Sequence, residues 1–294
     1  GGTNTDTNAP SSTAIDLGTG RTAVAVSAGT GHTCAILDNG DLKCWGNNGF
    51  GTLGDGTNTL RYAPSATAVD LGTGRTAVAV SAGGLHTCAI LDNGDLKCWG
   101  KDDYGQLGDG GSNTNTNAPS STAINLGTGR TAVAVSAGEE HTCAILDNGE
   151  TKCWGGDSWG QLGDGGTNTN TNAPSSTAIN LGTGRTAVAL STDQYHTCAI
   201  LDNGDLKCWG RDYNGQLGDG GSNTDQSSPV AVSGSNTWDS STTASSGSGS
   251  GSGSATQSNF TASIEGADLI IDEAMTNITF QYNTSAASGS GSGS

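Results

Sequence analysis

The sequence predicts an all-β fold: a β-propeller-like array of four four-stranded antiparallel blades, followed by a Gly/Ser-rich tail. Three observations indicate this fold. A unit of about 54 residues occurs four times, with the string HTCAILDNGxxKCWG beginning at His32, His86, His141 and His196. Short β-prone segments are separated by Gly or Asn-Gly turns, and no segment has the apolar periodicity of a helix. Such units cannot bury an apolar face alone, so they stack on one another.

Four strands are expected in each unit. Residues 22–29 alternate Val with small side chains, and residues 32–37 form an apolar run. An Asp-Asn-Gly turn leads to the third strand, residues 42–46. After a long polar loop comes the fourth, at 66–71, with an equivalent segment at 12–17 before the first unit. Four antiparallel strands in a repeat of this length are typical of a propeller blade.

Eight cysteines fall in four pairs of constant spacing, which does not match the short spacing of zinc knuckles. In a three-residue hairpin loop with Gly40 left-handed, Cys34 lies opposite Cys44; a two-residue Asn-Gly turn would oppose Cys34 to Trp45. The first register works in every copy. We therefore expect disulfides, in preference to free thiols, with Cα separations of roughly 4.4–6.8 Å and an oxidising compartment. The pairs are Cys34–Cys44, Cys88–Cys98, Cys143–Cys153 and Cys198–Cys208.

Acidic residues dominate the charge, with 28 Asp and Glu against 11 Lys and Arg and a net charge of −17. This balance disfavours nucleic acid and anionic membrane surfaces as partners. No apolar run reaches the roughly 18 residues of a membrane span, so no membrane insertion is expected within this chain. The opening residues match the middle of a repeat, which predicts that further sequence lies upstream.

Strand direction assigns the loops to two ends of each blade. The AGxxH turns and the loops after each Trp-Gly pair form one end, here called the top face. The Asp-Asn-Gly and Gly-Thr-Gly-Arg turns form the other, the bottom face. There the arginines are expected to pair with the hairpin aspartates: Arg21, Arg75, Arg130 and Arg185.

The copies differ mainly on the top face. Variable aromatic side chains on a constant scaffold suggest a recognition surface, and drift in duplicated loops is the alternative. The candidate contact residues are Phe50, Leu85, Tyr104, Trp159, Tyr195 and Tyr213, with Asp102, Asp103, Asp157 and Asp212 around them. Aromatic rings bordered by carboxylates suit a glycan or a protein with basic groups.

No catalytic set stands out from the repeat background, and neither a metal nor a cofactor is expected. The four histidines occupy one position of the repeat, which indicates a structural hydrogen-bonding role. The loops that follow the GxLGDG strings contain oxygen ligands but lack the residue order of a calcium loop.

The second copy meets a known pattern of Gly-x-x-His, strand, Asp-Gly, Trp-Gly and Gly-Gln-Leu-Gly through Gly83, His86, Gly94, Trp99, Gly100, Gly105, Gln106, Leu107 and Gly108. The first copy departs from it with Thr52 in place of Gln. Residues 1–232 thereby resemble the regulator of chromosome condensation repeat family, in its secreted microbial type. The resemblance implies a β-propeller, usually of seven blades. Four units are too few for that ring, so the chain is a fragment of a longer array, or its arc stays open or closes differently.

Members of this family include a nuclear nucleotide exchanger and a secreted inhibitor of beta-lactamase, so the fold does not define the activity. We expect a non-enzymatic, secreted or cell-surface repeat protein that acts as a binding or structural module through its top face. The alternative is a secreted inhibitor or regulator of an enzyme, with an exchange factor as one form of it. The expected partner is a protein or a glycan, or a second copy of the chain.

The tail is predicted to contain three segments. Residues 233–258 are a flexible Gly/Ser linker, residues 259–287 are a short β segment that could begin a sandwich domain, and residues 288–294 are linker again. Three N-x-[ST] sequons occur only here, at Asn259, Asn277 and Asn283, which favours an exported glycoprotein.

Overall fold

The computed structural model describes residues 11–166, 169–221 and 223–233, and two short strands at 261–264 and 267–270. Contacts divide the chain into two units, residues 1–234 and 235–294. In the second unit, β14 (Thr261–Ile264) pairs with β15 (Ala267–Ile270) as an antiparallel hairpin. The three sequons of the tail lie outside the described residues.

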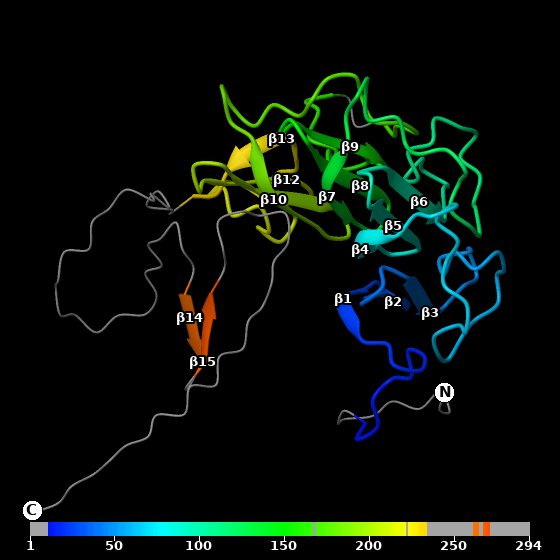
Figure 1. The fold of residues 1–294 in the computed structure, drawn as a ribbon. Helices are drawn as coiled ribbons and strands as arrows, with labels where there is room; N and C mark the ends of the chain where they lie inside the picture. Colours follow the sequence, from blue (N-terminus) through cyan, green and yellow to red (C-terminus); the bar gives the residue numbers. More distant parts are fainter. Residues whose placement is uncertain (1–10, 167–168, 222, 234–260, 265–266, 271–294) are drawn as a thin grey trace, which may run out of the picture. The chain divides into compact units, whose positions relative to one another are not determined.

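The first unit confirms the predicted all-β fold. Its four antiparallel sheets follow the order of the repeats, and the described residues contain no helix (Figure 1). The strands are β1 (Ala23–Ala28), β2 (His32–Leu37) and β3 (Leu42–Gly46); β4 (Ala77–Ala82), β5 (His86–Leu91) and β6 (Leu96–Gly100); β7 (Ala132–Ala137), β8 (His141–Leu146) and β9 (Thr151–Gly155); and β10 (Ala187–Thr192), β11 (His196–Leu201), β12 (Leu206–Gly210) and β13 (Gln226–Ala231).

The fourth strand differs from the prediction in the first three repeats, whose sheets have three regular strands. There the fourth segment meets the third strand at two points. In the third repeat, Thr171 bridges to Gly155, and Ile179 donates its N–H to the Thr151 carbonyl at 2.9 Å. Ile179 follows Thr171 by eight positions, whereas Val232 follows Gln226 by six in the last repeat, where β13 pairs with β12 with one register shift, between Cys208 and Gly210. The two extra residues must bulge away from β9, which interrupts the ladder.

Each hairpin has the predicted three-residue turn. Leu37 donates its N–H to the Asp41 carbonyl at 2.9 Å, Gly40 has a φ of +80°, and Cys34 lies opposite Cys44. All four cysteine pairs are disulfides, with Cα atoms 4.1 Å apart. This separation is shorter than expected. Leu37 and Asp41 form a hydrogen-bonded pair, and such pairs alternate along an antiparallel ladder. Cys34 and Cys44 lie three positions further on, at a non-hydrogen-bonded pair, where Cα atoms approach to about 4.5 Å.

Each apolar core lies between two consecutive sheets, so the second strands of the two middle sheets are buried on both faces. On β5, Ala89 and Leu91 pack toward the first repeat, whereas Cys88 and Ile90 pack toward the third. Burial on both faces explains why the second strand is an uninterrupted apolar run. In the second, third and fourth repeats the tryptophan of the third strand fills the core toward the preceding repeat: Trp99, Trp154 and Trp209, all fully buried.

A hydrogen-bond network crosses each boundary between sheets. His86 Nε2 lies 2.9 Å from Thr142 Oγ1, which donates to the Gln106 carbonyl at 2.8 Å. Trp154 Nε1 donates to the same carbonyl at 3.0 Å. Because the threonine hydroxyl gives its one proton to the carbonyl, it must accept from the histidine, which places the histidine proton on Nε2. The equivalent sets are His32, Thr87, Thr52 and Trp99, and His141, Thr197, Gln161 and Trp209.

These histidines have the structural role that their repeat position predicts. Burial lowers the pKa of His32 to about 4 and the pKa of His86 and of His141 to about 3. They are therefore neutral at physiological pH, and the one ring proton of each lies on Nε2.

Consecutive repeats approach closely at the glycine of the AGxxH turn. A Cβ atom on Gly83 would collide with the Gly138 carbonyl of the next repeat, and Gly29 and Gly138 are constrained in the same way. The fourth repeat has Asp193 at this position, and no further copy of the repeat follows it in the printed sequence. The glycine is thus required at each of the three described boundaries.

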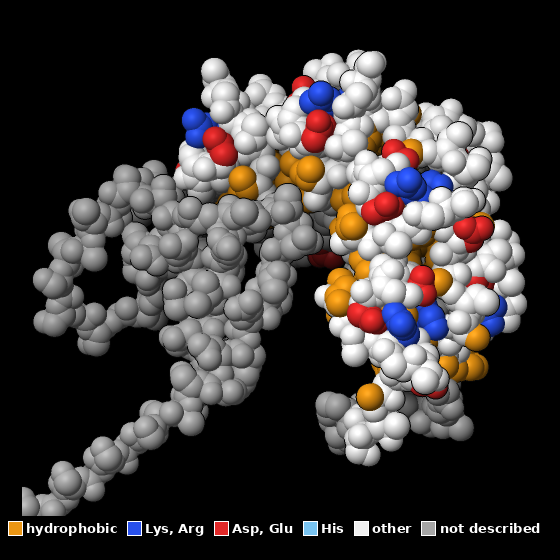
Figure 2. Space-filling model, viewed as in Figure 1, with side chains coloured by type: hydrophobic (Ala, Val, Ile, Leu, Met, Phe, Trp, Pro, Cys, Tyr) orange, Lys and Arg blue, Asp and Glu red, His pale blue; other side chains and the backbone are white. Residues whose placement is uncertain are grey.

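On the bottom face, the predicted arginine–aspartate pairs form in all four repeats. Their N–O distances are 3.1–3.3 Å, and they join Arg21 to Asp38, Arg75 to Asp92, Arg130 to Asp147 and Arg185 to Asp202. Figure 2 shows basic and acidic side chains next to one another at several places along the repeats. All are partly exposed, so each pair stabilises the fold by at most about 1 kcal/mol.

Candidate binding surface

The two variable loop sets lie together at one end of each sheet. The residue after each Trp-Gly pair donates its N–H to the AGxxH turn of the same repeat: Lys101 to the Leu85 carbonyl and Arg211 to the Tyr195 carbonyl, both at 2.9 Å. The arginine–aspartate pairs lie beside the hairpin turns at the opposite ends of the strands. The geometry therefore matches the top and bottom faces defined from strand direction.

The AGxxH turns also meet across repeats. Thr30 of the first repeat donates its hydroxyl to Glu139 of the third at 3.4 Å. A Cβ atom on Gly84 of the second repeat would meet the same carboxylate. These turns therefore form one continuous surface over three repeats.

Three of the four aspartates predicted to border this surface are buried instead. Asp102 is fully buried, and its Oδ1 accepts the Leu107 N–H at 2.9 Å. Asp157 and Asp212, each 1% exposed, accept the N–H of the leucine five positions on in the same way. These aspartates hold the two ends of the loop together by hydrogen bonds, and because they are buried they cannot contact a partner. Only Asp103 has an exposed carboxylate, at 52% of its side-chain surface.

In the first repeat, Asn48 stands at the position of these buried aspartates, and its amide makes the equivalent hydrogen bond. Asn48 Oδ1 accepts the Leu53 N–H, and its Nδ2 donates to the Thr57 carbonyl at 2.9 Å and to Asp55 at 3.2 Å. By contrast, Asp102 Oδ2 is buried without a hydrogen-bond partner. Burial raises the pKa of Asp102, and likewise that of Asp157, to about 6.

Lys101 organises one group of aromatic side chains. Its Nζ lies 5.6 Å from the Phe50 ring centre and 5.5 Å from that of Tyr104, within the range of cation–π attraction. The ammonium also pairs with Asp103 at 3.3 Å. Glu140 lies near Lys101 and Tyr104, and burial raises the pKa of this carboxyl. We call these five residues the lysine cluster; it joins three repeats.

Arg211 organises a second group, here called the arginine cluster, with Trp159, Tyr195 and Tyr213. The guanidinium carbon lies 4.7, 5.5 and 5.8 Å from the respective ring centres. The Trp159 and Tyr195 rings are 6.2 Å apart and inclined by 56°. Among the described residues Arg211 has no carboxylate within ion-pair distance, whereas the five other arginines each have one.

The predicted contact residues differ in exposure and in the cluster to which they belong. Phe50 and Tyr213 are exposed, and the other four aromatic or apolar candidates are half-buried. Leu85 belongs to neither cluster. Lys101 and Arg211 were missed as centres, although the aligned copies contain the signal: one variable position holds a cation in two repeats, and Asn47 or Gly156 in the others.

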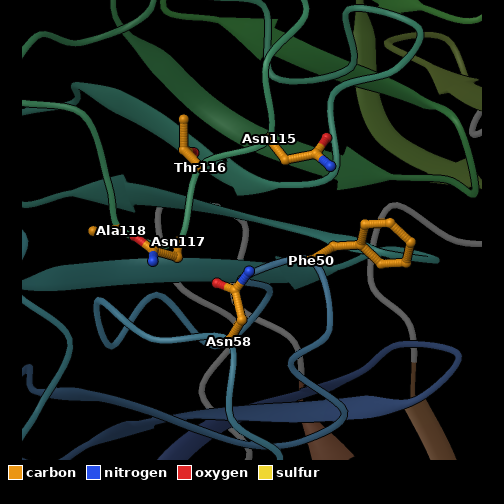
Figure 3. A pocket seen from close by; sticks show the side chains of 6 residues that line it. All are labelled: Phe50, Asn58, Asn115, Thr116, Asn117 and Ala118. Atoms are coloured by element: carbon orange, nitrogen blue, oxygen red, sulfur yellow. The ribbon is translucent and has the colours of Figure 1, made fainter.

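A polar groove of about 350 Å³ opens beside Phe50. Figure 3 shows Phe50 and Asn58 from the loop of the first repeat, facing a segment of the second repeat that carries the remaining lining residues: Asn115, Thr116, Asn117 and Ala118. Asn115 is partly engaged, because its Oδ1 accepts the Asp102 N–H at 2.7 Å. Only Phe50 is common to the groove and the lysine cluster.

Among the described residues, no three His, Cys, Asp or Glu side chains are grouped so that they could hold a metal ion. No helix in that part of the chain is long and apolar enough to cross a membrane.

Two curated proteins illustrate the sequence similarity of the repeats. The Ultraviolet-B receptor UVR8 of Arabidopsis thaliana is 32% identical over 212 residues, which are 70% of this chain and 45% of that protein. The probable E3 ubiquitin-protein ligase HERC4 of Homo sapiens is 33% identical over 210 residues, 71% of this chain and 19% of that protein. The chain thus spans less than half the length of these relatives.

Solved structures show the same fold. The structure of human WBSCR16 matches with a TM-score of 0.63 and 24% identity, over 71% of this chain and 52% of that one. Yeast RCC1 (Prp20) bound to Kap60 matches with a TM-score of 0.64 and 18% identity, over 76% and 51%. At these identities the similarity establishes the fold alone.

Two models of the Regulator of chromosome condensation (RCC1) repeat match the chain. One matches residues 23–52, 77–106, 132–161 and 185–216, and the other matches residues 39–90 and 93–145. Together they cover more than half of the chain and parts of all four sheets. With the repeated boundaries and the propeller-type sheets, these matches show that the chain belongs to the RCC1 repeat family.

Proposed function

We propose that this chain is a non-enzymatic binding module that takes a protein partner on its top face. The observation that carries the proposal is the pair of cation–aromatic clusters, built from residues that differ between otherwise near-identical repeats. The constant residues account for folding, so the variable ones are free to determine specificity. Loops held by a rigid scaffold are where binding residues concentrate.

Solved relatives support a protein partner. Yeast RCC1 (Prp20) was crystallised bound to Kap60, and Prp20p of Saccharomyces cerevisiae has binding properties to Gsp1p and histones. A partner that is itself an enzyme, regulated by this chain, would use the same surface.

We further propose that the chain works outside the cell or at its surface. Four disulfides support this location, because such bonds persist in oxidising compartments. Alkylation of the natively prepared protein without reduction, followed by mass spectrometry, tests it. Eight alkylated cysteines would contradict both the bonds and the location.

Selection from a displayed peptide library, with a glycan array in parallel, tests the binding role. The double variant Tyr104→Ala/Trp159→Ala should weaken capture of selected peptides at least tenfold while the melting temperature changes little. The matched bottom-face control, Arg75→Ala/Arg130→Ala, should retain capture. Binding of glycans alone would contradict a protein partner, and loss of binding only in the bottom-face variant would contradict the assignment of the surface.

A further inference from the structure

Lys101 and Arg211 occupy equivalent positions, directly after the Trp-Gly pair of their repeats, yet their surroundings differ in one respect. Two residues after Lys101 stands Asp103, which pairs with the ammonium at 3.3 Å. Two residues after Arg211 stands Tyr213, whose ring replaces that carboxylate. The lysine cluster thus contains a carboxylate that neutralises its ammonium, and the arginine cluster contains no carboxylate.

Other acids near Arg211 in the sequence do not compensate. Asp212 is 1% exposed and its Oδ1 accepts the Leu217 N–H, so it is committed to closing the loop. Asp157, before Trp159, is buried in the same role. Among the described residues the Arg211 guanidinium also donates no hydrogen bond. A guanidinium has five N–H donors, and those of the half-buried Arg211 are not used by any described residue, so they remain available to a ligand.

We propose that the arginine cluster binds the carboxylate of a single Asp or Glu side chain of a protein partner. The inference rests on the proposed function and specifies the chemistry of the partner. A guanidinium binds a carboxylate through two parallel hydrogen bonds, and the surrounding rings displace water that would weaken them. This replaces the expectation of a partner with basic groups, which depended on aspartates that are buried.

The surroundings also indicate what flanks that carboxylate. The Trp159 and Tyr195 rings are inclined by 56°, so they offer two separate apolar surfaces and no flat platform for one sugar ring. Apolar side chains on either side of the acid match such surfaces. The net charge of −17 repels a segment with many acids, so one isolated carboxylate is favoured.

Titration of the full chain with the capped peptide acetyl-Phe-Glu-Phe-amide, monitored by NMR, tests the inference. The control peptide has Gln in place of Glu. The Glu peptide should bind at least tenfold more tightly than the Gln peptide. Arg211→Ala should abolish this difference, and Arg211→Lys should reduce it, because an ammonium lacks the planar pair of donors.

Two variants form a matched pair for charge. Tyr213→Asp gives Arg211 the internal acid that Asp103 gives Lys101, and it should remove the preference for Glu. Gly49→Asp adds the same charge at the equivalent position of the first repeat, away from Arg211, and should leave the preference intact. An unchanged melting temperature in each variant shows that any loss belongs to the site.

Equal affinities for the two peptides, absence of binding, or a preference that survives Arg211→Ala would overturn the inference. Binding of a glucuronate oligosaccharide at Arg211, without binding of the Glu peptide, would overturn the protein source of the carboxylate. If Tyr104→Ala/Trp159→Ala abolishes partner capture while Arg211→Ala and Tyr213→Asp do not, the top-face function stands and the carboxylate site is wrong.

Discussion

The boundaries between repeats and the top-face loops differ in how much their residues vary from one repeat to the next. At a boundary, Trp154 is fully buried and donates to the Gln106 carbonyl, and its equivalents at the other two boundaries do the same. On the top face, Tyr213 is 73% exposed, and its equivalents are Gly49, Asp103 and Ser158. Identity between repeats therefore marks the residues that join sheets, and difference marks the residues that remain free for partners.

The first repeat shows what the boundary actually requires. Thr52 stands where the other copies have glutamine, yet its carbonyl accepts from Thr87 and Trp99 just as the Gln106 carbonyl accepts from Thr142 and Trp154. Because the boundary uses the backbone oxygen, the side chain at this position can change.

The largest expected effect is at a boundary. Trp154→Ala should lower the free energy of unfolding by about 3–5 kcal/mol, because it empties a packed core and leaves the shared carbonyl with one donor. Urea unfolding measures it. Trp45→Ala is the matched control: Trp45 is half-buried, and no described sheet precedes it. Similar losses of stability in both variants would show that packing at the boundary is not what makes Trp154 stabilising.

The disulfides come next. Cys88→Ala/Cys98→Ala should lower the free energy of unfolding by about 2–3 kcal/mol, because the bond closes a loop of roughly eleven residues in the unfolded chain. Thermal unfolding with and without reductant measures the change. The reductant should destabilise the wild type more than this variant, which has one bond fewer to lose; equal shifts would contradict a stabilising role for this pair.

The boundary histidines predict acid sensitivity. Burial depresses the pKa of His86 to about 3, so below pH 6.5 the unfolded chain binds a proton that the folded chain does not. Stability should fall as the pH drops from about 6.5 toward 3, by up to roughly 1.4 kcal/mol per pH unit for each histidine. His86→Gln should make stability depend less on pH. His196→Gln is the matched control, because His196 is half-buried in the last repeat. An unchanged slope in His86→Gln would exclude His86 as its source.

The smallest effect concerns the buried aspartates beneath the top face. Asp102→Asn copies Asn48 of the first repeat and should raise the melting temperature at pH 8. The raised pKa of Asp102, about 6, means that the folded carboxylate is charged at a cost there but is largely protonated at pH 5. The gain should therefore shrink as the pH falls. A gain that is constant with pH would show that charge is not its cause.

Local patterns predicted much of this structure. Turn chemistry and strand alternation correctly placed Gly40 in the hairpin, Cys34 opposite Cys44, and Arg75 beside Asp92. Each of these features depends on residues that are close along the chain or held in register by one turn. The variable loops likewise pointed to Trp159 and Tyr195, which the structure brings together across a boundary.

The sequence by itself thus determined the repeats, their hairpins and the end of each sheet at which the copies differ. Only the tertiary structure decided that Asp102 is buried beneath its loop and that the fourth segment bulges away from β9. It also decided that Arg211 lies among aromatic rings, with no carboxylate of the described residues in ion-pair distance. These outcomes depend on which groups from different loops and repeats meet in space. An exposed and a buried aspartate look alike in a polar loop, because the burial of a side chain is a property of its neighbours.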